Sequence, residues 1–208
     1  MPITALTLYL IFGLLGFGWR SWTQYRRTGS TGFRGINGHP GSLEWFAGVG
    51  FIAAILAGIA APLLQLLGVL SPVAPLHGSW IQASGTVLAV AGIVATLYAQ
   101  RDMGASWRIG VDRSETTTLV RHGVFNLVRN PIFTAMLVFA AGATLIAPNP
   151  LALIAFAVLA VTIELQVRVV EEPYLMATHG KAYRDYCKTV GRFVPHIGHI
   201  QSSESNIV

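Results

Sequence analysis

The sequence has little charge, few acidic residues and almost no cysteine. Only 11% of its 208 residues are charged, and the single cysteine is Cys187, which excludes an internal disulfide framework and a multi-cysteine zinc site. His39, His77, His196 and His199 lack metal-ligand spacing, so we predict no metal site. Apolar residues are abundant instead, at 53% of the chain with a mean hydropathy of +0.57. This composition is typical of a multi-spanning membrane protein.

Five apolar stretches are long enough to cross a bilayer, which takes roughly 20 mostly apolar residues, or about 17 when flanking side chains reach outward. They are 3–19, 43–70, 79–100, 132–148 and 151 to about 167. The first lacks the basic start and the cleavage site of a signal peptide, so we interpret it as a retained helix. The prolines of "APNP" predict a tight turn, which makes the last two spans an antiparallel hairpin. We therefore predict an all-α integral membrane protein with about five transmembrane helices.

The basic residues indicate an orientation. All 14 lysines and arginines follow the first, third or fifth span, and segments 1–2, 71–78 and 148–150 on the other side contain none. The positive-inside rule then places the N-terminus outside and the C-terminus in the cytoplasm. Membrane lipid explains the net charge of +5, and neither a basic cluster nor a stacking pattern indicates nucleic acid. The long segment 101–131 makes the cytoplasmic face the expected place for function.

The last apolar stretch ends in charged residues. Glu164 and Arg168 are four residues apart, and Glu171 and Glu172 follow Arg168 at three and four residues, so these side chains can share one helix face. A ladder of ion pairs that ends the span would explain the pattern. A site would explain it too, because Glu164 lies within the apolar run, where an ionisable group is costly without a partner. Pro173 should kink or restart the helix beside these carboxylates.

Two segments around the hairpin resemble a known family. "LVRHGVFNLVRNPIFTAMLV" precedes the hairpin and "EEPYLMATHGKAYRDYCKTVGRFVP" follows it. In this order they resemble the integral membrane methyltransferases that include isoprenylcysteine carboxyl methyltransferase and phospholipid N-methyltransferases. The matching positions are Gly104, Trp107, Gly123, Val128, Arg129, Pro131, Glu171, Glu172, Leu175, Gly180, Tyr183, Tyr186, Val190, Arg192 and Pro195. The chain departs from the family pattern at Val124, Phe125, Asn130, Phe133, Ala135 and His179, and Asn130 cannot titrate like the usual histidine.

The resemblance implies S-adenosyl-L-methionine as methyl donor and a lipophilic acceptor that enters from the bilayer. The cofactor-binding residues that it implies are Trp107, His122, Gly123, Val124, Phe125, Arg129, Asn130, Pro131, Phe133, Glu171 and Glu172. The acidic pair would hold the amino group or balance the sulfonium, and donors within 122–125 would take the carboxylate. As catalytic residues we expect Arg168 to orient a carboxylate acceptor, and Glu171 to act as base for a thiol or amine.

The resemblance also divides the chain into N-terminal membrane helices (1–100), a methyltransferase core with a cytoplasmic-face cofactor pocket (101–196) and a polar tail (197–208). The implied reaction is most like carboxyl O-methylation of an isoprenylcysteine-type substrate. Three alternatives stay open: methylation of a lipophilic thiol or phospholipid amine, an NADPH-dependent membrane reductase of related layout, and a non-enzymatic multi-span protein. Apolar lining residues encode shape and do not choose among acceptors.

Overall fold

The computed structural model describes residues 1–33, 35–36, 38–108 and 118–199, and helices form its regular elements. The α-helices are α1 (Pro2–Phe12), α2 (Arg20–Thr28), α3 (Leu43–Leu66), α4 (Ser79–Met103), α5 (Pro131–Ile146), α6 (Pro150–Leu165), α7 (Glu172–His179) and α8 (Lys181–Thr189). Two π-helical segments join neighbours, η1 (Gly13–Trp19) between α1 and α2, and η5 (Gln166–Glu171) between α6 and α7. Short 3₁₀ turns are η2 (Ala74–Leu76), η3 (Gly104–Ser106) and η4 (Gly123–Asn126).

Four continuous helical runs within the described residues are long and apolar enough to cross a membrane. They are Pro2–Thr28, Leu43–Leu66, Ser79–Ser106 and Pro150–His179. The remaining predicted span corresponds to α5, which has 16 residues and therefore extends about 24 Å at 1.5 Å per residue. That is shorter than the roughly 30 Å hydrocarbon core. The predicted all-α membrane fold is confirmed, while α5 falls below the length of a full span.

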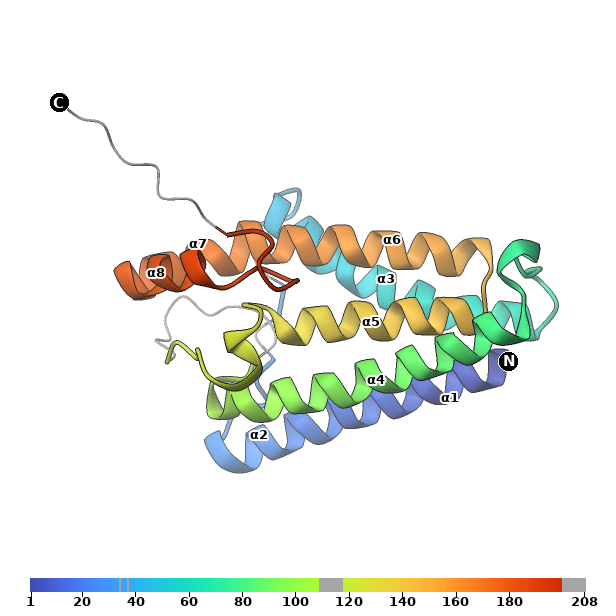
Figure 1. Ribbon diagram of the computed structural model, residues 1–208, viewed down its shortest axis with the longest axis horizontal. Helices are drawn as coiled ribbons and strands as arrows, with labels where there is room; N and C mark the ends of the chain where they lie inside the picture. Colours follow the sequence, from blue (N-terminus) through green and yellow to red (C-terminus); the bar gives the residue numbers. More distant parts are fainter. Residues whose placement is uncertain (34, 37, 109–117, 200–208) are drawn as a thin grey trace.

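The predicted hairpin forms around Asn149, whose side chain is completely buried. Its Oδ1 accepts a hydrogen bond from the backbone amide of Ala152 at 3.0 Å, which caps α6. Its Nδ2 donates to the carbonyl of Ala61 and to Oε1 of Gln65. The turn is thereby tied to the end of α3. Beyond the turn the two helices run alongside each other, but α5 packs mainly against α4, and α6 mainly against α3 (Figure 1).

Small residues bring these helices into close contact. A Cβ added at Gly142 of α5 would lie 2.4 Å from the backbone nitrogen of Ala89 in α4. In α3, a Cβ at Gly50 would meet Thr162 of α6 at 2.6 Å, and one at Gly58 would meet the Tyr9 hydroxyl of α1 at 2.6 Å. These glycines are used for packing within the chain.

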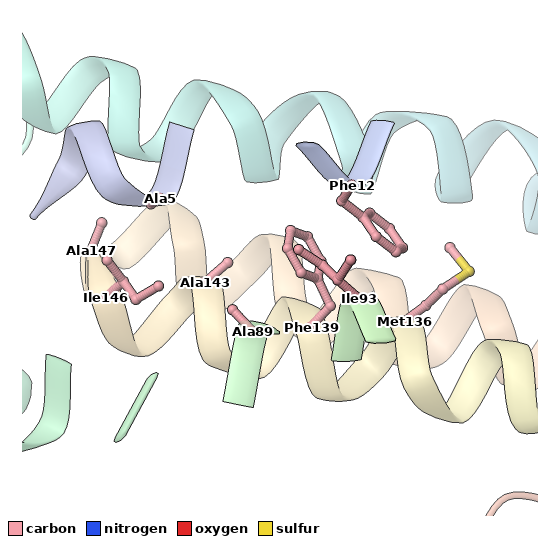
Figure 2. Close-up of a cluster of buried hydrophobic side chains, with 9 residues drawn as sticks. All are labelled: Ala5, Phe12, Ala89, Ile93, Met136, Phe139, Ala143, Ile146 and Ala147. Atoms are coloured by element: carbon pink, nitrogen blue, oxygen red, sulfur yellow. The ribbon is translucent and has the colours of Figure 1, made fainter. Parts of the chain in front are cut away.

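The core between α1, α4 and α5 is built on aromatic and small side chains. The rings of Phe12 and Phe139 stack with centroids 4.3 Å apart, and Met136, Ile93 and alanines pack around them (Figure 2). Tyr9 meets Phe139 edge-on at 5.0 Å. Apolar residues also remain exposed along the outer faces of the helices, as expected for helices surrounded by lipid.

One end of the bundle collects the polar elements. α2, the C-terminal end of α4, the start of α5, α7 and α8 lie at the end opposite the N-terminus (Figure 1). Every lysine and arginine among the described residues belongs to this end. The helical path also continues from α6 through the widened turn η5 into α7, with Pro173 in the first turn of α7, where its missing N–H is tolerated. The restart expected at Pro173 is therefore only a local widening.

Candidate active site

A cavity of about 360 Å³ opens at the polar end of the bundle, within the range of small-molecule sites. It has two chemically different walls. The apolar wall comprises Phe17, Phe51, Ile52, Ile55, Ile132, Phe133 and Met136. The polar wall comprises Gln100, Arg108, Asn130, Gln166 and Glu171, together with the aromatic residues Trp107, Phe125 and Tyr174. The cavity therefore offers a ligand both charged groups and hydrophobic surface.

Trp107 forms a fixed part of the polar wall. Its side chain is 2% exposed, and the guanidinium of Arg20 lies 5.0 Å from its ring centroid in a cation–π contact. Arg20 also donates to the carbonyl of Gly104, and Nε2 of Gln24 donates to the carbonyl of Ala105 at 2.8 Å. Helix α2 thus holds the segment that carries Trp107.

Arg129 binds the C-terminal segment to the start of α5. Its side chain is 1% exposed, and its Nη1 donates to the carbonyls of Cys187 and Val190 at 3.1 and 3.0 Å. Its Nη2 donates to Oε1 of Glu172 at 2.9 Å and to the carbonyl of Gly198 at 3.1 Å. Arg129 contributes to the cavity lining, but four hydrogen bonds already fix its guanidinium.

Glu172 has a second cationic partner, Arg192. Nε of Arg192 donates to Oε1 at 2.8 Å and Nη2 donates to Oε2 at 3.0 Å, the bidentate geometry of a strong pair. These hydrogen bonds raise the pKa of the Arg192 guanidinium above its ordinary value. We call the three residues the Arg129–Glu172–Arg192 clamp. Both oxygens of Glu172 are used within the clamp, and Glu172 is not among the residues that line the cavity.

Asn130 extends this connection by main-chain and side-chain hydrogen bonds. Its backbone amide and its Nδ2 both donate to the carbonyl of Arg192, at 3.1 and 3.2 Å. Thr134, one turn later, donates to the carbonyl of Phe193 at 2.9 Å. The polar side chain at position 130 therefore positions the C-terminal segment while it faces the cavity.

The structure separates the predicted residues of segment 122–125. Phe125 is buried, lines the cavity and accepts a hydrogen bond at its carbonyl from the Tyr186 hydroxyl. His122 is exposed, and Gly123 and Val124 pack on α4, where the Val124 amide donates to Asp102 at 2.9 Å. His122, Gly123 and Val124 are absent from the lining residues.

Glu171 and Arg168 have different surroundings, although they are one helical turn apart. Glu171 and Gln166 both line the cavity, and the positive charge of Arg108 acts on the Glu171 carboxylate. The side chain of Arg168 is 56% exposed, pairs with Glu164 and does not belong to the lining. Glu164 also lies 3.8 Å from Arg192, so it connects Arg168 to the edge of the clamp.

Sequence reasoning missed several polar-wall residues, above all Arg108, Gln100 and Gln166. The glutamines carried a usable signal, since a polar side chain inside an apolar helix needs a partner. Nε2 of Gln100 donates to the carbonyl of Gly16 at 2.8 Å. Arg108 directly follows Trp107 in the sequence, but nothing in the pattern distinguished it from the other basic residues. Among the described residues, no group of three His, Cys, Asp or Glu side chains is arranged to hold a metal.

The fold and the cavity define an all-helical integral membrane protein with a mixed polar and apolar ligand site. The profile of the phospholipid methyltransferase family matches residues 80–182. Protein-S-isoprenylcysteine O-methyltransferase A of Arabidopsis thaliana is 29% identical over 143 residues, which cover 66% of this chain and 73% of that protein. Protein-S-isoprenylcysteine O-methyltransferase B of the same plant is 29% identical over 120 residues, which cover 57% of this chain and 61% of that protein.

A solved structure has the same fold. It is that of the eukaryotic intramembrane Ras methyltransferase, isoprenylcysteine carboxyl methyltransferase, with a TM-score of 0.51 and 20% identity. The match covers 80% of this chain and 56% of that chain. These sequence matches confirm the resemblance to the isoprenylcysteine carboxyl methyltransferase and phospholipid methyltransferase family that the motifs indicated.

Proposed function

We propose that this protein transfers a methyl group from S-adenosylmethionine to a lipophilic acceptor, and that the acceptor is the carboxylate of an isoprenylcysteine-type substrate. The observation that carries the proposal is the two-walled cavity, because such a reaction must bring a charged donor and an apolar acceptor together. The names of the Arabidopsis relatives support the choice of acceptor.

The residues of the polar wall fit the donor. When bound, S-adenosylmethionine supplies an electrophilic methyl group on a sulfonium. Glu171 offers a carboxylate to its cationic groups, and Trp107 and Phe125 offer ring faces for adenine or the sulfonium, as does Phe133 of the apolar wall. Because methyl transfer is a displacement, positioning of the two reactants supplies much of the rate.

Arg129 and Glu172 were expected to contact the cofactor, but their place in the clamp suggests another role. We propose that both act as positioning residues, which hold the C-terminal segment against the polar wall. Glu171 is then the carboxylate that meets the ligand. A carboxylate acceptor is already ionised at neutral pH and needs no base, whereas a thiol or an amine would need Glu171 to accept a proton.

We further propose that the polar end of the bundle faces the cytoplasm and that the acceptor reaches the apolar wall from the bilayer. The distribution of lysine and arginine supports this orientation. The exposed Ile52 of α3 supports the route, since it lines the cavity while its side chain also reaches the helix surface. In this arrangement, only the reacting carboxylate has to leave the hydrophobic compartment.

The test is methyl transfer by the purified protein in lipid nanodiscs with methyl-tritiated S-adenosylmethionine. The acceptors are N-acetyl-S-farnesylcysteine, a farnesyl thiol and phosphatidylethanolamine, the last because the matching profile describes phospholipid methyltransferases. We expect base-labile methyl ester on the first acceptor, and strong loss of product in Glu171→Gln. Stable label on the thiol or the lipid amine would contradict the carboxylate assignment, and no transfer to any acceptor would contradict the reaction.

A further inference from the structure

We infer that Arg108 is the carboxylate-binding residue of the cavity. The inference rests on the proposed function, and it assigns a role to a side chain that the family motifs do not include. The carboxylate can belong to the amino-acid part of the methyl donor or to the acceptor, and the two sources are distinguished by experiment below.

Arg108 is held in the polar wall by an aromatic side chain. Its guanidinium carbon lies 4.9 Å from the centroid of the Tyr174 ring, and both residues line the cavity. A stacked guanidinium is oriented in a plane while its edge nitrogens remain able to donate. Trp107, immediately before it, is anchored by Arg20. The backbone and the side chain of Arg108 are therefore both positioned before a ligand binds.

The hydrogen-bonding capacity of Arg108 is not used up by the protein. Its Nη1 is buried and has no hydrogen-bond partner within the part of the chain that the structure describes. A buried donor without a partner is costly, and more so in a charged group. Arg129, the other arginine in the lining, also has a buried Nε without a partner among the described residues, but both of its Nη atoms already donate to carbonyl or carboxylate oxygens. Arg108 thus has a donor left for a ligand.

The negative charge of Glu171 in the same cavity defines what kind of ligand fits. Glu171 lies close enough for the charge of Arg108 to act on its carboxylate, and both residues face the same cavity. A ligand that carries an ammonium or sulfonium beside a carboxylate would match this pair of opposite charges. It would place its cation at Glu171 and its carboxylate at Arg108, so that neither protein charge remains unpaired.

Arg108 also takes the place of the residues that were expected to bind a carboxylate. Sequence reasoning placed them at residues 122–125, yet His122, Gly123 and Val124 lie outside the lining. Arg168, the cation expected to orient an acceptor carboxylate, is largely exposed and bound to Glu164. Among the lining residues, Arg108 is the cation that combines a position next to Glu171 with an unused buried donor.

The first arm of the test measures equilibrium binding by calorimetry in nanodiscs. S-adenosylhomocysteine is compared with its decarboxylated analogue, for the wild type and for Arg108→Gln. If the donor carboxylate binds Arg108, the wild type prefers S-adenosylhomocysteine by about 10- to 100-fold, as expected for a charged hydrogen bond. This preference should fall to within about threefold in Arg108→Gln.

The second arm applies the same comparison to the acceptor. N-acetyl-S-farnesylcysteine and its carboxamide are titrated in the presence of saturating S-adenosylhomocysteine. If Arg108 binds the acceptor carboxylate, the preference for the acid over the amide falls in Arg108→Gln, and the donor arm is unchanged. A collapse of the preference in either arm supports the inference and identifies the source of the carboxylate.

Arg101→Gln is the matched control, because Arg101 is an exposed arginine in the last turn of α4 outside the cavity. We expect it to keep both preferences. If Arg108→Gln does not fold, Arg108→Met replaces it, since methionine retains an apolar stem against Tyr174 without charge. If the wild type binds the ligands and the Arg108 variants keep both preferences for the carboxylate-bearing ligand, the inference is overturned but the proposed function is not. Absence of all ligand binding by the wild type overturns the proposed function together with it.

Discussion

The Arg129–Glu172–Arg192 clamp makes a quantitative prediction about stability. Replacement of Glu172 by glutamine keeps the size of the side chain and removes its charge. The matched control is Glu164→Gln, which makes the same chemical change near the end of α6, two helical segments earlier. The side chains of Arg129 and Glu172 are 1% and 13% exposed, whereas Glu164 is 38% exposed and pairs with an exposed Arg168.

The expected magnitudes follow from burial. Loss of one partner from a buried ion pair costs about 3–5 kcal/mol, because the other charge stays buried without compensation. Arg129 retains three carbonyl acceptors after the change, which puts the expected cost at the lower end, about 3 kcal/mol. For the more exposed pair of Glu164, the expected cost is about 0–1 kcal/mol.

Thermal unfolding in detergent micelles measures the difference. For a chain of this size, about 3 kcal/mol corresponds to a decrease in Tm of about 6–12 °C, and Glu164→Gln should change Tm by no more than about 4 °C. The double variant with Arg192→Gln should be less destabilised than the sum of the single variants, since the two residues share one interaction. Equal Tm values for the two glutamate variants would refute the reasoning.

Three further predictions concern packing, thiol reactivity and the choice of arginine. Gly142→Ala should destabilise the protein by about 1–3 kcal/mol through overpacking, because its Cβ would lie 2.4 Å from a backbone nitrogen of α4. Gly13→Ala should not have this effect, because a Cβ at Gly13 would meet open space. Chemical unfolding of the two variants measures the difference. Burial raises the pKa of the Cys187 thiol, so maleimide should label it far more slowly in the folded protein than after unfolding at the same pH. Arg168→Gln should lower kcat/KM less than Arg108→Gln; the opposite order would support Arg168 as the orienting cation.

The helices and their hairpin were predictable because apolar length and paired prolines are local signals. Glu171, Trp107, Phe125 and Phe133 were also expected near a ligand, and they line the cavity. The ends of the spans were less predictable, since η5 and α7 continue the last apolar helix well beyond the position where charges begin. Length and hydropathy describe a bilayer crossing but not the helical extension into the polar region.

The different environments of Glu171 and Glu172 could not be predicted from their sequence. Consecutive residues on a helix point about 100° apart, so two adjacent carboxylates need not face the same compartment. Which of them faces the cavity depends on the C-terminal segment. Arg192 returns to Glu172 from 20 residues later, and Arg129 reaches it from 43 residues earlier. No periodic pattern encodes contacts over such separations.

The central claim is that the polar wall binds the adenosyl methyl donor through Glu171. Calorimetric titration of the purified protein with S-adenosylhomocysteine and, in parallel, NADPH tests it most directly. We predict saturable binding of S-adenosylhomocysteine that is weakened by about tenfold or more in Glu171→Gln, with no comparable affinity for NADPH. Absence of saturable S-adenosylhomocysteine binding, or tight NADPH binding in its place, would contradict the account.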